Sequence, residues 1–383
     1  MPEPSESESD SARAAALREL LGVERWERLE PWAVARVRVR CADVAPSVVV
    51  KWAEGGPVQG RDAGWRLRTE VAALRFLRDD VGIGLAPRVI AADTAAGFVV
   101  LEDLAPRTAL DRLLRRDGAA AHGDRLAAFA RALGELGAAT AGRAEDYYAR
   151  RAGLGPVDPA ADRAGRLAPY RDRGIEHAVG LGVPPEAGAA TEIGAVADEL
   201  AAPGPFLALG NGDAEANNVL LHASGPADAR LIDFEFAGYA HALTDAVCLH
   251  VPGPAWMTVG DPAEGPDLAG HYRRALARGV PEAEDDRRYG FGLAAACVSW
   301  SLIRMERFAL LDARPPGDRS RPQLVATLEA AAHTARSHRA LPHLTAWFQR
   351  IAALLRRRWP DADQDFTDPV RFPAYQARHA PSM

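Results

Sequence analysis

The chain has 383 residues, of which 48% are hydrophobic and 26% are charged, and its formal net charge is −6. A chain of this length and composition is able to fold into two lobes with sizeable cores. The acidic balance excludes a broad basic face for nucleic acid or for anionic membranes. No segment approaches the roughly 18 uninterrupted apolar residues that a membrane span needs.

The N-terminus and the cysteines indicate a cytoplasmic protein. Residues 1–10 are acidic and polar, unlike a signal peptide, and are predicted to form a disordered tail. Cys41, Cys248 and Cys297 are widely spaced and fit no zinc pattern, so they are interpreted as reduced thiols. We therefore expect neither a nucleic-acid partner nor a membrane partner, and the oligomeric state stays open.

Lys51 stands out among the 46 basic residues, because all the others are arginines. The arginine excess is typical of a GC-rich genome. Lysine and arginine are not interchangeable where a compact ammonium group is needed. Lys51 is therefore either a lysine left by chance on the surface or a residue at a position that needs a compact ammonium group.

The first part of the chain combines helical and strand patterns. A helix is predicted to begin at Ser11, and strand patterns follow at 33–41 and 47–52. A helix capped by Asp62 has apolar residues at helical spacing, and a hairpin is predicted over 89–101. Up to about residue 103 the predicted order is helix, strand, strand, helix, strand, strand.

The rest of the chain is predicted to be mainly helical. Two short strands, 219–221 and 230–232, flank a turn. Helical patterns cover 110–116, 124–137 with a continuation to 151, 162–174, 191–201, 271–278, 286–311, 321–337 and 344–359. The predicted fold class is α+β, with a small sheet lobe containing one helix over 11–103 and a large helical lobe over 104–383.

The densest polar cluster of the sequence contains Asp213 and Asn218, five residues apart. Asp233 follows fifteen residues after Asn218, beyond the predicted short hairpin. Phosphoryl transfer on a kinase-type scaffold requires this spacing, because one Asp orients the attacking hydroxyl while an Asn and a second Asp hold Mg²⁺. Taken alone, Asp213 and Asn218 are also compatible with a polar loop, since Asp, Asn and Gly favour turns.

These motifs resemble a known family. Gly212-Asp213-x-x-x-x-Asn218, Ile232-Asp233-Phe234-Glu235 and then Asp245 are similar to the aminoglycoside phosphotransferase and choline-kinase-like branch of the protein-kinase-like superfamily. The resemblance covers about residues 30–250 and implies a two-lobed kinase-like fold. It also implies ATP as phosphoryl donor, with GTP as an alternative, and Mg²⁺ as the metal. Asp213 would be the catalytic residue, and Asn218 and Asp233 the metal ligands.

The N-terminal lobe carries matching features. Lys51 ends a Val-Val-Val strand, as the nucleotide-binding lysine of the resembled family does, and Glu70 follows nineteen residues later on a predicted helix. The resemblance implies an ion pair between them. It also implies that main-chain groups at Glu102 and Leu104 contact adenine in the segment that joins the lobes. Asp245 is interpreted as structural, bracing the catalytic loop.

Two departures from the resembled family concern the catalytic loop and the phosphate lid. Asn211 stands where the family commonly has His before Gly-Asp, and we expect this change to be tolerated. There is no glycine between Gly22 and Gly55, so the loop between the first two predicted strands would close over the nucleotide without one.

The sequence therefore predicts a small-molecule kinase. The acceptor would be a hydroxyl of an antibiotic, a sugar or a related metabolite, because no protein-kinase activation segment with an Ala-Pro-Glu stretch follows Asp233. The alternative is a non-catalytic protein that binds a nucleotide or another ligand and retains the kinase-like fold.

Overall fold

The structure is a computed structural model that describes residues 23–29, 34–39, 46–53, 64–118, 120–251, 267–316 and 320–362. The tail 1–10, the helix expected from Ser11, the cap at Asp62 and the expected lid at 42–45 lie outside these residues. The chain divides into two compact units. The first contains Met1–Pro106, Asp146–Val157 and Phe234–Phe236, and the second contains Arg107–Glu145, Asp158–Asp233 and Ala237–Met383.

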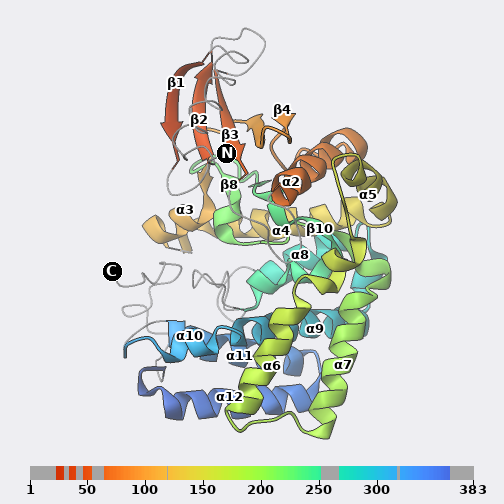
Figure 1. Ribbon diagram of the computed structural model, residues 1–383, viewed down its shortest axis with the longest axis vertical. Helices are drawn as coiled ribbons and strands as arrows, with labels where there is room; N and C mark the ends of the chain where they lie inside the picture. The colour runs from red at the N-terminus through yellow and green to blue at the C-terminus, as the bar shows by residue number, and fades with distance from the viewer. Residues whose placement is uncertain are drawn as a thin grey trace, which may run out of the picture. The chain divides into compact units, whose positions relative to one another are not determined.

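An antiparallel five-stranded sheet forms the first unit (Figure 1). Its strand order is β1-β2-β3-β5-β4, with β1 Val23–Arg28, β2 Val34–Val39, β3 Ser47–Trp52, β4 Val89–Asp93 and β5 Phe98–Glu102. Four of these strands were predicted. Strand β1 was not, because it lies at the edge and its residues Arg25, Glu27 and Arg28 are polar and exposed.

The side-chain period of two determines which face of this sheet is buried. Val37 on β2 and Val48 and Val50 on β3 are fully buried and join Val100 in one apolar cluster. Lys51 follows Val50 directly and therefore points to the opposite face of β3. The alternation thus explains how a strand with a hydrophobic core face presents a single ammonium group on its other side.

Helix α2, Trp65–Arg75, belongs to the same unit and continues into a π-helical segment, Phe76–Val81. The predicted helical spacing is confirmed, because Leu67, Val71 and Leu74 are all buried. Helix α5, Ala144–Ala152, packs against this region through the ring of Tyr147, which lies edge-on to Phe76 at 5.6 Å.

The second unit is mainly helical, as predicted (Figure 1). Its larger helices are α3 Leu110–Asp117, α4 Gly123–Thr140, α6 Ala168–Gly180, α7 Ala187–Ala201, α8 Leu268–Leu276, α9 Asp286–Met305, α10 Phe308–Asp312, α11 Ser320–Ser337 and α12 Pro342–Arg358. Helix α4 packs on α8, and α9 packs on α6 and α11. The single helix predicted over 286–311 is wrong, since a turn at Glu306 and Arg307 separates α9 from α10.

Two small sheets interrupt the helices of the second unit. Strands β6 Thr108–Ala109, β8 Val219–Leu221 and β9 Arg230–Leu231 form one of them, and β8 and β9 are the predicted hairpin. Strands β7 Leu207–Gly210 and β10 Gly238–His241 form the other. The sequence did not predict β6, β7 or β10. These strands are only two to four residues long, too short to show the alternation of apolar and polar residues that indicates a strand.

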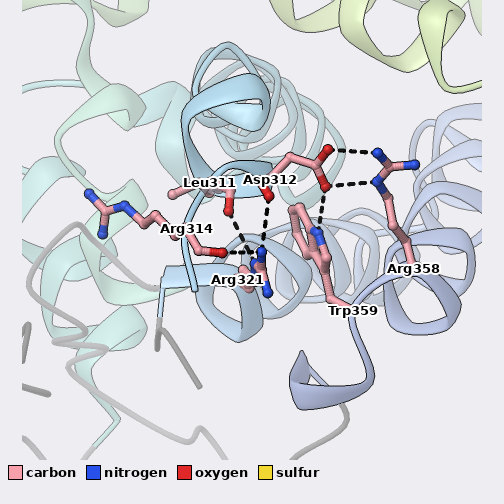
Figure 2. A network of polar contacts seen from close by, with 6 residues as sticks. All are labelled: Leu311, Asp312, Arg314, Arg321, Arg358 and Trp359. Carbon is pink, nitrogen blue, oxygen red and sulfur yellow. Dashed lines mark hydrogen bonds and ion pairs between the residues drawn. The ribbon is translucent and has the colours of Figure 1, made fainter. Parts of the chain in front are cut away.

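A polar network ties α10 to α11 and α12 (Figure 2). The buried guanidinium of Arg321 donates hydrogen bonds to the carbonyls of Leu311, Asp312 and Arg314. The carboxylate of Asp312 accepts two bonds from Arg358, at 2.6 and 2.8 Å, and one from Trp359 Nε1 at 2.8 Å. Because α10 follows α9 directly, these contacts also hold the end of α9 in place.

No helix within the described residues is long and apolar enough to cross a membrane.

Candidate active site

The β8–β9 hairpin brings two of the predicted site residues together. Asn218 precedes β8 at the end of a short 3-10 turn, Ala216–Asn218, and Asp233 follows β9 after one residue. The backbone N–H of Ile232 donates to the carbonyl of Asn218 at 2.9 Å. The antiparallel register therefore places Asp233 next to Asn218, although fifteen residues separate them in the chain.

Asp213 is held by the same amide side chain. Nδ2 of Asn218 donates to Oδ2 of Asp213 at 3.0 Å and to the backbone carbonyl of Asp213 at 2.8 Å. The charge of Asp233 also acts on Asp213, which shows that the two carboxyl groups are close. The structure thus brings Asp213, Asn218 and Asp233 into one site.

Asn211, at the position where the resembled family has His, links the two loops of this site. Its Nδ2 donates to the carbonyl of Ile232 at 3.1 Å and to that of Asp233 at 3.4 Å. Its Oδ1 accepts a bond from the backbone N–H of Asp213 at 3.2 Å. A single buried amide therefore fixes the segment with Asp213 to the segment with Asp233.

Asp245 braces the start of the catalytic loop, which agrees with the structural role expected from the sequence. Its carboxylate accepts bonds from the backbone N–H groups of Asn211, at 2.7 Å, and Gly212, at 3.4 Å. A Cβ added at Gly210 would lie 3.1 Å from Oδ1 of Asp245, a tight contact that the absence of a side chain at Gly210 avoids. Gly212 has a φ of +80°, a conformation that glycine adopts without strain.

Asp233 adopts a left-handed backbone conformation, with a φ of +64°. Such a conformation is unfavourable for residues other than glycine, although Asp and Asn tolerate it best. It occurs at the position whose carboxylate is expected to bind metal. Strained backbone of this kind persists where surrounding structure holds it, often at functional sites.

The donor chemistry of this site fits Mg²⁺. Because Nδ2 of Asn218 points to Asp213, its Oδ1 remains as a carbonyl ligand, and it accepts one bond from Asn217 at 2.8 Å. Together with the carboxylate of Asp233 it offers two oxygen atoms, the hard ligands that Mg²⁺ prefers. The described residues contain no cluster of three His, Cys, Asp or Glu side chains able to hold a metal. A Mg²⁺ ion here would need further oxygens from phosphates and water.

Burial dominates the electrostatics of the catalytic loop. Burial first, and then the charge of Asp233, raise the pKa of Asp213, whereas the bond from Asn218 acts in the other direction. Burial also raises the pKa of Asp245 to about 6, against the opposing bonds from Asn211 and Gly212. A raised pKa makes Asp213 a better proton acceptor than an exposed carboxylate.

The first unit contains the other predicted residues. Nζ of Lys51 lies 2.8 Å from Oε1 and 2.7 Å from Oε2 of Glu70. The Glu70 side chain is only 2% exposed and the Lys51 side chain 15% exposed. The structure therefore brings this pair together, with the lysine supplied by β3 and the glutamate by the buried face of α2.

The predicted adenine-contacting segment lies at the end of β5. The backbone N–H of Glu102 is already bonded to the carbonyl of Arg88 at 2.9 Å. The backbone of Leu104, in contrast, makes no hydrogen bond with another described residue. Asp103, which lies between these two residues, accepts bonds of 2.7 Å from both Arg36 and Ser47. It therefore anchors this segment to strands β2 and β3.

Sequence reasoning missed three charged residues that take part in the electrostatics of the catalytic loop, namely Arg166, Glu215 and Arg304. Arg166 acts electrostatically on Asp213 and Asp245, and Glu215 interacts with Asp213 and with Arg304 on α9. Burial and the charge of Asp213 raise the pKa of Glu215 to about 8. Burial lowers the pKa of Arg304 to about 10, so it stays cationic at neutral pH. Arg166 and Arg304 are far from the motif in sequence, so no local signal pointed to them.

Comparison with known proteins identifies the family. The description of the matching family is "phosphotransferase enzyme family" (APH), and the match covers residues 59–291, more than half of the chain. The chain belongs to this phosphotransferase family. The matched segment includes Glu70 on α2 and the whole catalytic loop. The comparison with curated proteins gave no match.

Solved structures of similar fold include several kinases. An ethanolamine kinase from Plasmodium vivax has a TM-score of 0.52 at 12% identity, over 82% of this chain and 83% of that chain. A choline/ethanolamine kinase family protein from Mesorhizobium loti has a TM-score of 0.47 at 20% identity, over 91% of this chain and 99% of that one. The APH(2″)-IIa ternary complex with streptomycin and ATP has a TM-score of 0.48 at 12% identity, over 82% and 96%. The likeness to the ethanolamine kinase, whose TM-score is above 0.5, confirms the predicted kinase-like fold.

Proposed function

We propose that this phosphotransferase transfers the γ-phosphoryl group of ATP to a hydroxyl group of a small molecule, which is an antibiotic, a sugar or another hydroxylated metabolite. The observation that carries the proposal is the hydrogen bond of 3.0 Å between Asn218 and Asp213, in a loop fixed to Asp233. This arrangement joins a base, an amide oxygen and a second carboxylate, which are the groups that phosphoryl transfer uses.

Asp213 is the residue that acts on the acceptor. Its carboxylate accepts a hydrogen bond from the acceptor hydroxyl and aims the oxygen at the γ-phosphorus. A bond forms between this oxygen and phosphorus, the bond from phosphorus to the β,γ-bridging oxygen breaks, and ADP leaves. The hydroxyl proton passes to Asp213 and then to solvent. The raised pKa of Asp213 supports its role as proton acceptor.

Asn218 and Asp233 would hold Mg²⁺ through the amide and carboxylate oxygens described above. When bound, the ion supplies positive charge that neutralises the phosphate oxygens during transfer. Asn211 and Asp245 keep these ligands in place through backbone hydrogen bonds and do not contact the reactants themselves.

Lys51, Glu70 and Leu104 bind the nucleotide. The ammonium of Lys51 contacts the α- and β-phosphates, and the buried carboxylate of Glu70 orients it. Arginine has a wide planar fork that would fit poorly between a phosphate and this carboxylate, which explains the single lysine of the chain. The backbone of Leu104 makes no hydrogen bond with another described residue, which supports a contact with adenine. Glu102 has only its carbonyl to offer because its N–H is already bonded.

A thermal-shift titration tests the proposal. Mg²⁺–ATP should raise the melting temperature of the full chain with increasing concentration, and Mg²⁺ alone should not. GTP in the same titration measures nucleotide preference. A shift with ATP but no release or transfer of phosphate would favour the non-catalytic binding protein. No shift at all would contradict nucleotide binding.

A further inference from the structure

Helix α5 comes from a part of the chain between two helices of the second unit, yet Asp146–Val157 belong to the first unit. There α5 lies beside α2 (Figure 1). The ring of Tyr147, which is 1% exposed, packs edge-on against that of Phe76. Arg150 donates to both carboxylate oxygens of Asp80, at 2.6 and 2.9 Å. These contacts attach α5 to the π-helical segment that continues α2.

The guanidinium group of Arg151 on α5 reaches the first turns of α2 itself. Arg151 is only 5% exposed. Its Nε donates to Oγ1 of Thr69 at 3.3 Å, and its Nη2 donates to the backbone carbonyl of Trp65 at 3.4 Å. Oγ1 of Thr69 in turn donates to the same carbonyl at 2.7 Å. Burial of an arginine is unfavourable unless its guanidinium group is hydrogen-bonded, and these bonds to α2 help to compensate for it.

Thr69 directly precedes Glu70 on α2. Successive residues of an α-helix point in directions about 100° apart, so the two side chains leave α2 toward different neighbours. Thr69, 4% exposed, faces α5, and Glu70, 2% exposed, faces Lys51 on β3. A rotation or shift of α2 would move both side chains together, because the same helical turn carries them. A bond that fixes Thr69 to α5 therefore also fixes the carboxylate of Glu70 next to Lys51.

Trp65 extends this arrangement to the segment that follows Asp233. The centroid of its ring lies 5.8 Å from that of Phe236, in an edge-on geometry. The guanidinium group of the next residue, Arg66, lies 4.9 Å from the ring centroid of Phe236 and 3.5 Å from Oε1 of Glu235. The turn of α2 that accepts the bond from α5 thus also contacts the chain directly after the proposed metal ligand.

We propose that Arg151 is a positioning residue for phosphoryl transfer, because it holds α2 in the place where Glu70 meets Lys51. This inference rests on the proposed function, in which Lys51 contacts the phosphates. Arg151 touches neither the nucleotide nor the acceptor, and no bond is made or broken at it. Its loss leaves Thr69 bonded to the carbonyl of Trp65, so the helix itself is kept while α2 becomes free to move relative to β3.

Hydrogen exchange measured by mass spectrometry tests the structural step on the full chain. Arg151→Met keeps a long apolar side chain and removes the guanidinium group. It should speed the exchange of the amides of α2 by about 10-fold, the effect of one charge-assisted hydrogen bond, and leave α11 unchanged. Arg357→Met, at an exposed position of α12, is the matched control and should change neither helix. Unchanged exchange of α2 in Arg151→Met would overturn the inference.

A double-mutant cycle tests the functional step, with phosphate release from Mg²⁺–ATP as the readout because it needs no identified acceptor. Arg151→Met should lower kcat/KM by roughly 10- to 100-fold, the cost of a misplaced group at a reaction site. In the background Glu70→Gln, which lacks the ion pair, the same substitution should lower kcat/KM by no more than about 3-fold. Equal losses in both backgrounds would contradict the inference, because a merely structural role predicts them.

Two further measurements keep this cycle decisive. Calorimetric titration of Mg²⁺–ATP into the same four proteins repeats the cycle on nucleotide affinity, without turnover, and should show the same non-additivity. Arg151→Lys keeps a charged donor and should recover part of the lost activity. It also takes the place of Arg151→Met in both experiments if the methionine variant does not fold.

The inference and the proposed function fail in different ways. If the wild-type chain hydrolyses Mg²⁺–ATP and Arg151→Met does so at the wild-type rate, only the inference about Arg151 is wrong. If the wild-type chain neither binds nor hydrolyses Mg²⁺–ATP, the proposed function is wrong and the inference falls with it.

Discussion

Oδ2 of Asp245 accepts a hydrogen bond of 2.7 Å from the backbone N–H of Asn211, at the start of the catalytic loop. The carboxyl group is buried, and burial raises its pKa to about 6. The structure thus places an ionisable group behind the catalytic loop, where it holds the backbone without facing a reactant. This arrangement has a consequence for stability as a function of pH.

The contribution of Asp245 to stability should decrease as the pH rises from about 4 to about 6. A raised pKa means that the folded state keeps its proton in a range where the unfolded state, with its ordinary pKa of 3.8, has lost it. Over this range wild type should lose up to roughly 3 kcal/mol relative to Asp245→Asn, and no more above it. Urea unfolding of both proteins from pH 4 to pH 8 measures the difference. A constant difference across this range would contradict the account.

Asn211→Ala should lower the free energy of unfolding by about 1–3 kcal/mol. The substitution leaves the carbonyl of Ile232 and the N–H of Asp213 without their partner inside the protein. Gln349→Ala, at an exposed position of α12, is the control and should change stability little. Asn211→His restores a ring donor and should recover part of the loss. An unchanged melting temperature in Asn211→Ala would show that the amide link is dispensable.

Lys51→Met should destabilise the first unit as well as weaken nucleotide binding. It removes the ammonium group that contacts the carboxylate of Glu70, which is 2% exposed, and breaking a buried pair costs about 3–5 kcal/mol. The double variant Lys51→Met, Glu70→Gln should recover much of the stability but none of the affinity for Mg²⁺–ATP. Lys51→Arg keeps the charge and should still lose activity, since its fork does not replace an ammonium group. Wild-type turnover in Lys51→Arg would mean that the lone lysine has no special role.

Asp233→Asn and Asp233→Ala separate backbone strain from metal binding. Asn tolerates the left-handed conformation at a φ of +64°, whereas Ala should lose about 1–2 kcal/mol of stability. Both variants remove the carboxylate, so both should abolish the thermal shift caused by Mg²⁺–ATP. Circular dichroism melts and the nucleotide titration measure the two effects independently. A full Mg²⁺–ATP shift in Asp233→Asn would rule out Asp233 as a metal ligand.

The sequence predicted those parts of the fold whose pattern is local. The alternation of valines in β2 and β3 and the spacing of Leu67, Val71 and Leu74 in α2 follow directly from burial of one face. Strand β1 was missed because an edge strand buries little apolar surface and therefore shows no clear hydrophobic pattern. The break between α9 and α10 was missed because no glycine or proline marks it, and the network of Asp312 and Arg321 holds the separate helix in place.

The candidate site likewise has a part that local sequence spacing predicts and a part that only the folded structure shows. Asp213, Asn218 and Asp233 lie in one motif, so their spacing and the hairpin between them sufficed to predict that they meet. Glu215 belongs to the same loop, but the spacing of the sequence does not show that its side chain is buried or that an arginine of α9 acts on it. The bonds from Arg36 and Ser47 to Asp103 could not be predicted from the sequence either, because they depend on the register of strands β2 and β3.

The most direct test of the account is phosphate release from Mg²⁺–ATP by Asp213→Asn, measured beside its nucleotide affinity. Asparagine keeps the size of the side chain but cannot accept the proton of the attacking water or hydroxyl. We predict that phosphate release falls by at least about 100-fold, the lower range of what a positioned base contributes, while the affinity for Mg²⁺–ATP stays within a few-fold of wild type. Phosphate release at the wild-type rate in Asp213→Asn would contradict the assignment of Asp213 and, with it, the proposed mechanism.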